Sequence, residues 1–443
     1  MSRRITALTS ATAGATLLTL AAAVLAQNSE PSDRQSLQVD GERLNASMER
    51  MKDFGGTPEG GSTRVAYSAA NAEALEYLAG LMAAAGLTTE IDAAGNLVGR
   101  RAGSDSRLQP VVTGSHIDTV PNGGHYDGIV GVMSAIEVAQ TLHDAGTELR
   151  HPLEVVVWSN EEGGKTGSRA VMGAVEESEF DLPSLGDKTL GEGMRFLGGD
   201  PGRIGTVERE PGDIAAYVEL HVEQGAILDR AGIPIGVVEG IVGIRRWNVT
   251  FEGFANHAGT TPMDQRQDAL YAAARFVTLV RRLVTDMPGS QVATVGRIEA
   301  HPGAPNVIPG RATLSLEIRD LSMDKIGLLF DRIQAASETL AEETETSIRF
   351  EQFYESPAAP TDERIRRLVE ASADALGLAH RRMPSGAGHD AQSLAPIGPI
   401  GMIFVPSRNG VSHAPSEYTS PEQITHGANV LLRVLLGIDA EFD

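Results

Sequence analysis

The sequence predicts an α/β catalytic domain built on a mostly parallel sheet, with a smaller α+β sandwich inserted into it. Short apolar runs alternate with stretches of helical periodicity in the first half of the chain, as in strand–helix–strand proteins. Near residue 244 the order becomes strand–helix–strand–strand–helix–strand. With 443 residues, the chain is long enough for two ordinary domains. We therefore expect a catalytic domain at 27–243 and 354–443, and an inserted domain at 244–353.

The first part of the catalytic domain shows both kinds of periodicity. Alanine and leucine recur every three or four residues, which predicts helices at 41–54, 71–85 and 130–145. Apolar runs bounded by polar, glycine or proline residues predict buried strands at 111–112, 153–158 and 216–220. Ligands gather at the carboxyl ends of the strands in sheets of this kind.

The inserted domain shows a different pattern of apolar and polar residues. Alternating and apolar runs predict strands at 247–251, 292–299 and 312–318, and one-sided apolar faces predict helices at 268–286 and 323–342. Beyond residue 354 the chain is expected to return to the first domain.

Composition excludes several classes of function. The formal net charge of −22 makes nucleic acids and anionic membrane surfaces poor partners, and reflects solubility more than a cationic substrate. The expected partner is a small-molecule substrate. The absence of cysteine excludes disulfides, thiol nucleophiles and thiolate zinc sites. The 49 glycines and the 41% hydrophobic content suit a globular protein with many tight turns.

Residues 1–26 predict a secretory signal peptide. Arg3 and Arg4 precede an apolar stretch that ends in small residues before Gln27, and the arginine pair favours twin-arginine export. The alternative is an uncleaved membrane anchor. We expect an exported, periplasmic protein that has no stable membrane association once the signal is removed.

Carboxylate and imidazole side chains recur in five short segments, several of them directly after predicted strands. The segments are TGSHIDTV with His116 and Asp118, GGHYDGIVGV with Asp127, WSNEEGG with Glu161 and Glu162, ELHVEQG with His221, and NGVSHAPSEY with His413. Such ligands, in a chain without cysteine, predict a hydrolytic two-metal centre. They suit zinc or manganese, with cobalt or nickel also possible. The expected chemistry is attack of metal-activated water on a carbonyl.

The spacing suggests roles within this set. His116 is expected to bind metal directly, while the carboxylate of Asp118 orients its imidazole. Asp127 lies among glycines and can bridge two ions. Glu161 and Glu162 are adjacent, so one can bind metal while the other takes a proton from water. Taken singly, each side chain has an ordinary structural explanation; the prediction rests on the set.

These segments resemble the aminoacylase/carboxypeptidase-type dimetal amidohydrolases, in the branch of the N-carbamoyl-L-amino-acid hydrolases, β-ureidopropionases and allantoate amidohydrolases. The resemblance implies one metal at Asp127, Glu162 and His413, another at His116, Asp127 and His221, and Glu161 as general base and later general acid. The peptidase branches usually have a carboxylate where this chain has His221, which favours the carbamoylase and allantoate branch.

The inserted domain carries matching segments, and the resemblance makes it a lid and dimerisation domain. In GFANHAGTTPMDQRQDA, His257 is expected to cross the interface of a homodimer and polarise the scissile carbonyl of the partner's site. Asn306 in GAPNVIPG and Arg319 in LEIRD resemble the pair that grips the substrate carboxylate.

Three further residues are implied to line the substrate pocket. Gln224 should face the substrate, and Gly388 and His389 in SGAGHDA should shape the pocket. The chain departs from the family pattern after the glutamate pair, where Lys165 and Thr166 stand in place of the usual Arg-Phe. This puts the shape of the pocket near the leaving group, and the substrate preference, in doubt.

Two other functions remain open at the level of sequence. A dipeptidase or aminoacylase would use the same centre with an acyl group larger than carbamoyl. A non-catalytic periplasmic binding protein would need to have lost the metal or the base, whereas this chain keeps both ligand set and base.

Overall fold

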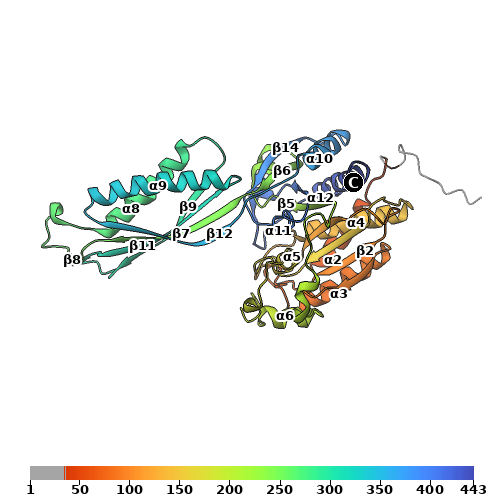
Figure 1. Ribbon diagram of the computed structural model, residues 1–443, viewed down its shortest axis with the longest axis horizontal. Helices are drawn as coiled ribbons and strands as arrows, with labels where there is room; N and C mark the ends of the chain where they lie inside the picture. The colour runs from red at the N-terminus through yellow and green to blue at the C-terminus, as the bar shows by residue number, and fades with distance from the viewer. Residues whose placement is uncertain (1–33, 35) are drawn as a thin grey trace, which may run out of the picture. The chain divides into compact units, whose positions relative to one another are not determined.

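The computed structural model describes residue 34 and residues 36–443, so the predicted signal peptide lies outside the described residues (Figure 1). From Leu37 to Asp443 the chain forms one compact unit. Within the described residues, no helix combines the length and the apolar character needed to cross a membrane.

A nine-stranded sheet forms the centre of the catalytic domain, in the order β1-β2-β4-β3-β5-β15-β6-β13, with β14 also paired to β6. The strands are β1 (Thr88–Ile91), β2 (Leu97–Arg101), β3 (Val111–His116), β4 (Leu153–Trp158), β5 (Ala216–Val222), β6 (Ile235–Ile241), β13 (Ala359–Pro360), β14 (His380–Ser385) and β15 (Ile400–Val405). The central strands β4, β3, β5 and β15 run parallel and are buried along their whole length. This burial explains their continuous apolar runs.

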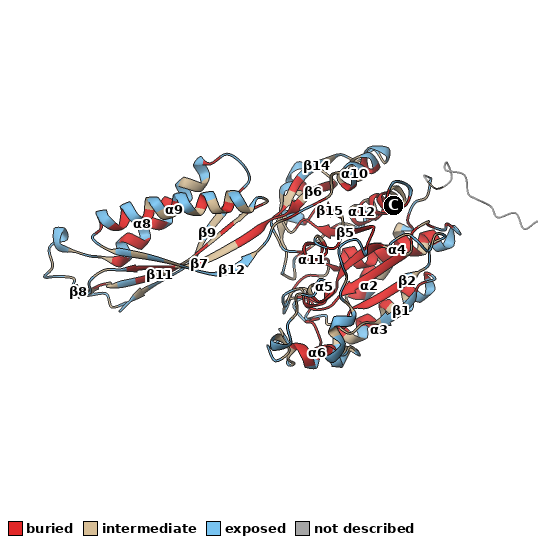
Figure 2. Ribbon diagram, in the orientation of Figure 1, coloured by how far each residue is buried: buried red, intermediate tan, exposed pale blue. Residues whose placement is uncertain are grey.

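Helices cover both faces of this sheet. On one face lie α2 (Gly41–Met51), α3 (Ala69–Ala84), α4 (Ile129–Asp144), α10 (Glu363–Ala375) and α12 (Pro421–Glu441). On the other face lie the short helices α5 (Thr166–Val171), α7 (Ile227–Ala231) and α11 (Ala391–Leu394). Figure 2 shows the buried residues on the sheet and on the inward sides of the helices. The predicted α/β class is confirmed, and the expected helices start and end within three residues of α2, α3 and α4.

The inserted segment forms a four-stranded antiparallel sheet in the order β12-β7-β11-β9. Its strands are β7 (Gly243–Glu252), β9 (Val292–His301), β11 (Arg311–Asp320) and β12 (Ser347–Ser356), and α8 (Ala269–Asp286) and α9 (Met323–Glu343) pack on it. Burial alternates along β11, as expected for a sheet with one covered face. The predicted limits of the insertion fall at the start of β7 and within β12.

A small two-stranded ribbon extends this domain. It pairs β8 (Asn256–His257) with β10 (Val307–Ile308), beyond the ends of β7 and β11 that carry Glu252 and Arg311. The remaining helix of two turns, α6 (Leu190–Leu197), belongs to the catalytic domain and begins with a capping box from Thr189 to Glu192.

Candidate metal centre

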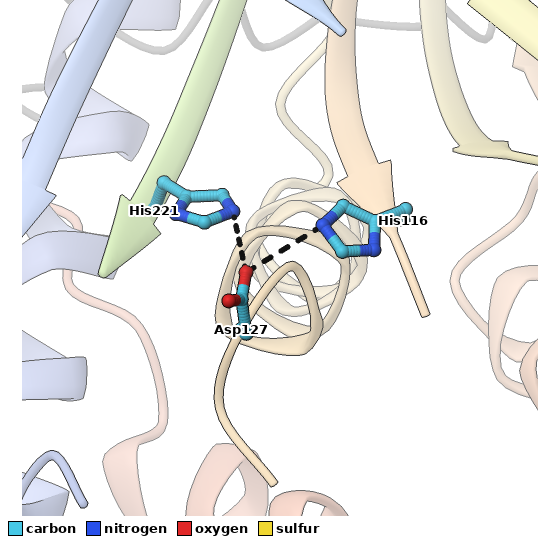
Figure 3. Close-up of side chains that lie close together, drawn as sticks. All are labelled: His116, Asp127 and His221. Carbon is cyan, nitrogen blue, oxygen red and sulfur yellow. Dashed lines mark ion pairs between the residues drawn. The ribbon is translucent and has the colours of Figure 1, made fainter. Parts of the chain in front are cut away.

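The predicted metal-binding side chains meet at one edge of the parallel strands. His116 is the last residue of β3, His221 lies near the end of β5, and Glu161 and Glu162 follow β4. Parallel neighbours end on the same side of a sheet, so residues far apart in the sequence come together there. Figure 3 shows the imidazoles of His116 and His221 turned toward the carboxylate of Asp127, in front of a helix.

Asp127 lies at the centre of the group. Its Oδ1 atom is 3.2 Å from Nε2 of His221 and 3.6 Å from Nε2 of His116. Its Oδ2 atom is 3.1 Å from Nε2 of His413, which in turn is 3.3 Å from Oε1 of Glu162. One carboxylate thus faces two groups of ligand atoms, each within 4.8 Å: His116, Asp127 and His221, and Asp127, Glu162 and His413.

The turn that presents Asp127 depends on Gly128. This residue precedes α4 with a φ of 68°, and a Cβ atom here would lie 2.5 Å from the imidazole of His116. Only glycine tolerates both the positive φ and the close approach. The glycine-rich segment around Asp127 therefore lets the backbone come close to the ligand on β3.

Two of the histidines are oriented by backbone carbonyl groups. Nδ1 of His116 lies 3.0 Å from the carbonyl oxygen of Asp118, and Nδ1 of His221 lies 2.9 Å from that of Val222. A carbonyl oxygen can only accept, so each Nδ1 carries a proton, and Nε2 is the ring atom left turned toward Asp127 to bind a metal ion. This is the arrangement of imidazoles that bind metal through Nε2.

Asp118 acts differently from the prediction. Its carboxylate lies 3.8 Å from Nδ1 of His116, beyond hydrogen-bond distance. It accepts instead from the backbone N–H groups of Glu161 (3.2 Å) and Glu162 (3.1 Å). Asp118 thus orients the imidazole through its main chain and holds the glutamate loop through its side chain.

The electrostatics of the centre fit divalent cations. Burial raises the pKa of Glu162 to about 8, and the carboxylates of Asp127 and Glu161 act in the same direction. Burial also raises the pKa of Glu161 and of Asp118. Several carboxylates thus share a site poor in water, where a dication would offset their charge.

A buried oxygen atom of Gln224 without a hydrogen-bond partner in the described part of the chain also indicates a bound group. Nε2 of Gln224 donates to Oδ2 of Asp127 at 2.7 Å, while Oε1 of Gln224 is buried without a hydrogen-bond partner among the described residues. Such an acceptor needs a bound group to satisfy it. The residues present therefore fit metal ions and a substrate at this place.

The two halves of the centre differ in exposure. The side chains of His116 and His221 are 2% and 1% exposed, whereas that of His413 is 46% exposed. A hydrogen bond to Asp127 raises the pKa of His413 to about 9. The half with His413 and Glu162 is therefore the one open to solvent.

Sequence reasoning missed Glu417, a buried carboxylate that supports the centre. Its Oε1 accepts from the backbone N–H groups of Tyr126 (2.8 Å) and Asp127 (3.0 Å). Its Oε2 accepts from Oγ of Ser412 (3.0 Å) and from the N–H of His413 (3.3 Å). The position of this glutamate, four residues after His413, was the available clue.

His389 packs directly behind the centre. Its ring centroid lies 4.4 Å from that of His221, and its Nε2 is 2.8 Å from Oγ of Ser385. Burial and the neighbouring His221 lower its pKa well below the usual value, so this imidazole stays neutral. Glu219, His221 and His389 form a third close group, but Glu219 already accepts from Ser115, Tyr217 and the N–H of Ala391.

The predicted residues of the inserted domain lie in two separate places. His257 and Asn306 are exposed and adjacent on the two-stranded ribbon, where the N–H of Ala258 donates to the carbonyl of Asn306. Arg319 lies near the opposite end of β11, about 27 Å from Arg311 at the rise of an antiparallel strand. Within one chain, Asn306 therefore does not reach the carboxylate that Arg319 would bind.

Arg319 is anchored next to the catalytic domain. Its Nη1 donates to the carbonyl of Gly386 (2.7 Å) and its Nε to Glu317 (2.7 Å), which also pairs with Arg246 (2.6 Å). Two guanidinium groups share one carboxylate here, so a positive charge remains available. Gly386 belongs to the loop that leads to Gly388 and His389, which places Arg319 beside the predicted pocket.

The orientation of His257 suits a hydrogen-bond donor. Its Nδ1 accepts from the N–H groups of Gly259 (3.0 Å) and Thr260 (3.2 Å). The proton of the neutral imidazole is therefore on Nε2, which faces away from this turn.

Comparisons with known proteins agree with this geometry. Residues 112–437 match the model of peptidase family M20/M25/M40. The chain is 39% identical to an N-carbamoyl-L-amino acid amidohydrolase of Geobacillus stearothermophilus, over 89% of this chain and 97% of that protein. It is 35% identical to an allantoate amidohydrolase of Bacillus subtilis, over 91% of this chain and 98% of that protein. A solved structure of a hydantoinase/carbamoylase family amidase from Burkholderia multivorans is 37% identical in sequence. It superposes with a TM-score of 0.85, over 92% of this chain and 99% of that chain. The chain therefore belongs to peptidase family M20/M25/M40.

Proposed function

We propose that the chain is a two-metal amidohydrolase that cleaves a linear C–N bond in N-carbamoyl-L-amino acids or allantoate-like ureido acids. The observation that carries the proposal is the convergence of three imidazole Nε2 atoms on the carboxylate of Asp127, with Glu162 beside them. The activities named for the relatives of Geobacillus stearothermophilus and Bacillus subtilis support the substrate class.

Two sets of residues would hold the ions. Asp127, Glu162 and His413 would bind one, and His116, Asp127 and His221 would bind the other, with Asp127 shared. When bound, the ions supply Lewis-acid activation of the water and of the substrate carbonyl. Ligands of this type suit zinc or manganese, and also accept cobalt or nickel.

Glu161 would carry the proton. Its backbone is fixed by Asp118, and its Oε2 lies 3.7 Å from Nε2 of His116, so the carboxylate faces the centre. It takes a proton from the attacking water, and later gives it to the leaving nitrogen as the C–N bond breaks. The raised pKa caused by burial suits a group that acts as base and then as acid.

Binding of the substrate would rest on the pocket around the 385–389 loop. Arg319 would hold the substrate carboxylate through its guanidinium, and Gln224 would face the bound substrate with its unpartnered Oε1. Gly388 and His389 would form the wall behind the metals.

We propose that the active form is a homodimer in which the lid of one subunit completes the site of the other. His257 and Asn306 lie far from Arg319 in one chain, so they can act on one substrate only from a second copy. The inserted domain also exposes large apolar side chains that a second copy would cover, with Tyr271 of α8 57% and Ile298 of β9 47% exposed. The Nε2–H of His257 would donate to the developing oxyanion.

The test of the function is release of ammonia from N-carbamoyl-L-amino acids and allantoate, with and without added manganese or zinc. Dipeptides and N-acetyl amino acids are run beside them with detection of the free amine. Metal-dependent ammonia release supports the proposal. Cleavage of only the second group would instead favour a dipeptidase or aminoacylase, and metal-free protein without turnover would favour a binding protein.

We further propose that residues 1–26 direct export to the periplasm. The support is the basic start, the apolar stretch and the small residues before Gln27. N-terminal sequencing of protein recovered from the periplasm should begin near Gln27; an intact Met1 in the membrane fraction would contradict cleavage.

A further inference from the structure

The ammonium group of Lys165 lies beside the centre, without an ion-pair partner in the part of the chain that the structure describes. Lys165 is half-buried, and among the described residues no carboxylate oxygen lies within 4.0 Å of its Nζ. Nζ instead donates a hydrogen bond of 2.5 Å to Oε1 of the neutral Gln392. Removing an ammonium from water without a counter-charge is costly, and burial accordingly lowers the pKa of Lys165.

The structure holds this ammonium in place from two sides. Nε2 of Gln392 donates to the carbonyl of Pro357 (2.6 Å) and to Oγ of Ser356 (3.1 Å), so its Oε1 must face Lys165. Lys165 itself has a φ of 57°, uncommon for a residue with a side chain, in the turn whose N–H bonds back to Glu161 (2.9 Å). The strained turn that follows Glu161, the proposed base, and Glu162, the proposed metal ligand, thus sets the direction of the Lys165 side chain.

Lys165 also lies against the pocket loop. A Cβ atom at Gly388 would come within 3.5 Å of Nζ, and the carbonyl of Gly386, in the same loop, accepts from Arg319. Two cations therefore contact one short loop, and a single residue, Ala387, separates their contact points at Gly386 and Gly388. The imidazole of His389 follows directly after Gly388. Nζ of Lys165 donates one hydrogen bond among residues 36–443, which leaves two of its three N–H groups for a substrate.

We propose that Lys165 is a specificity-determining residue that binds a second carboxylate of the substrate, so that ureido derivatives of dicarboxylic amino acids are preferred over those of apolar ones. This inference rests on the proposed function. Arg319 takes the α-carboxylate and Lys165 takes the side-chain carboxylate, each by charge-assisted hydrogen bonds. Lys165 then gains a carboxylate in direct hydrogen-bond contact, which it lacks among the described residues.

The competing explanation is that Lys165 serves the neighbouring acids. Glu161 and Asp390 both act electrostatically on Lys165, and a lysine that only offsets their charge would affect every substrate alike. A specificity-determining lysine affects anionic substrates alone. The two explanations therefore predict different results for the ratio of kcat/KM between an anionic and a neutral substrate when Lys165 is replaced. The ratio falls if Lys165 determines specificity, and it stays constant if Lys165 only offsets the neighbouring charges.

The experiment compares N-carbamoyl-L-glutamate with its neutral isostere N-carbamoyl-L-glutamine and with N-carbamoyl-L-methionine, for the metal-loaded dimeric protein. The wild type should prefer the glutamate derivative by about tenfold to a hundredfold, the range of one charged hydrogen bond. Lys165→Met should abolish that preference, mainly through KM, and Lys165→Arg should keep most of it. Lys188→Met, at a half-buried lysine paired with Asp187, is the matched control and should leave the substrate preference unchanged.

Equal rates for the wild type on the glutamate and glutamine derivatives would overturn the inference while leaving the proposed function intact. So would a Lys165→Met variant that lowers kcat on all three by the same factor. Absence of ammonia release from every ureido acid would overturn the proposed function, and the inference with it. The ranking of substrates by the wild type needs no variant, so a variant that fails to fold does not remove the test.

Discussion

Glu417 accepts a hydrogen bond of 3.0 Å from the backbone N–H of Asp127, although 290 residues separate the two in the chain. The same carboxylate accepts from the N–H of His413. It therefore fixes the bridging carboxylate and the exposed imidazole relative to each other. A neutral amide at this place would present a donor to some of these N–H groups and could not satisfy them all.

Glu417→Gln should weaken metal binding by about tenfold to a hundredfold, the usual cost of losing a group that orients ligands. Competition with a chelator measures the affinity directly. Glu422→Gln, at an exposed residue in the first turn of α12, is the control. An unchanged affinity in Glu417→Gln would show that the loops hold their geometry without this carboxylate.

Glu161→Gln should bind both metals normally and lose turnover by a factor of about 10²–10⁴, the range for loss of general acid–base catalysis. The amide keeps the shape of the side chain but cannot take a proton from water. Metal content by elemental analysis and ammonia release together test this. A variant that retains activity would remove Glu161 from its proposed role.

The dimeric site can be tested by mixing two inactive variants. Glu161→Gln lacks the base and His257→Ala lacks the donor from the lid, so each homodimer should be inactive. A mixed dimer contains one site with both groups, and statistical exchange should restore about a quarter of wild-type activity. No recovery after proven subunit exchange would mean that His257 acts within its own chain or not at all.

Gly128→Ala should destabilise the metal-free protein by about 2–4 kcal/mol, because the new methyl group meets the imidazole of His116 in a backbone conformation that is also strained. Gly146→Ala is the matched control: its φ is 59°, and nothing lies within 4 Å of the added carbon. It should cost only about 1–2 kcal/mol, the strain of the left-handed backbone. Thermal unfolding of both variants without metal gives the difference. Equal losses would show that His116 moves aside freely.

Metal binding should release protons, and more of them at pH 7 than at pH 9.5. Without metal, the pKa of Glu162 is about 8 and that of His413 is about 9, so both groups are largely protonated at pH 7. Each must lose its proton to bind a cation, so affinity should rise with pH until about pH 9. Calorimetry in buffers of different ionisation enthalpy counts the released protons. A count that does not change with pH would contradict these shifts.

The strand-end residues could be predicted because their pattern is local. His116, Glu161, Glu162 and His221 each follow an apolar run, and parallel strands bring such ends together. The fold class followed from the same alternation of strands and helices.

The contacts between distant loops could not be predicted in the same way. Glu417 accepts from main-chain N–H groups, which every residue except proline has, so the sequence does not indicate this contact. Asp118 orients His116 through its carbonyl oxygen and holds the N–H of Glu161 through its carboxylate, a combination that the sequence does not predict. Asn306 and Arg319 were paired through the resemblance, yet a single chain separates them along β11. The proposed second copy would bring the two together, and the association of two copies leaves no local pattern in the sequence.

The difference in exposure between His413 and the two buried histidines would make two bound ions exchange at different rates. The ion held by Glu162 and His413 would reach solvent directly, whereas the ion held by His116 and His221 would be enclosed by buried side chains. Brief dialysis against a chelator would then strip one position and leave the other filled. Refilling with a different metal would yield a defined hetero-dinuclear enzyme, in which the contribution of each position is measured separately.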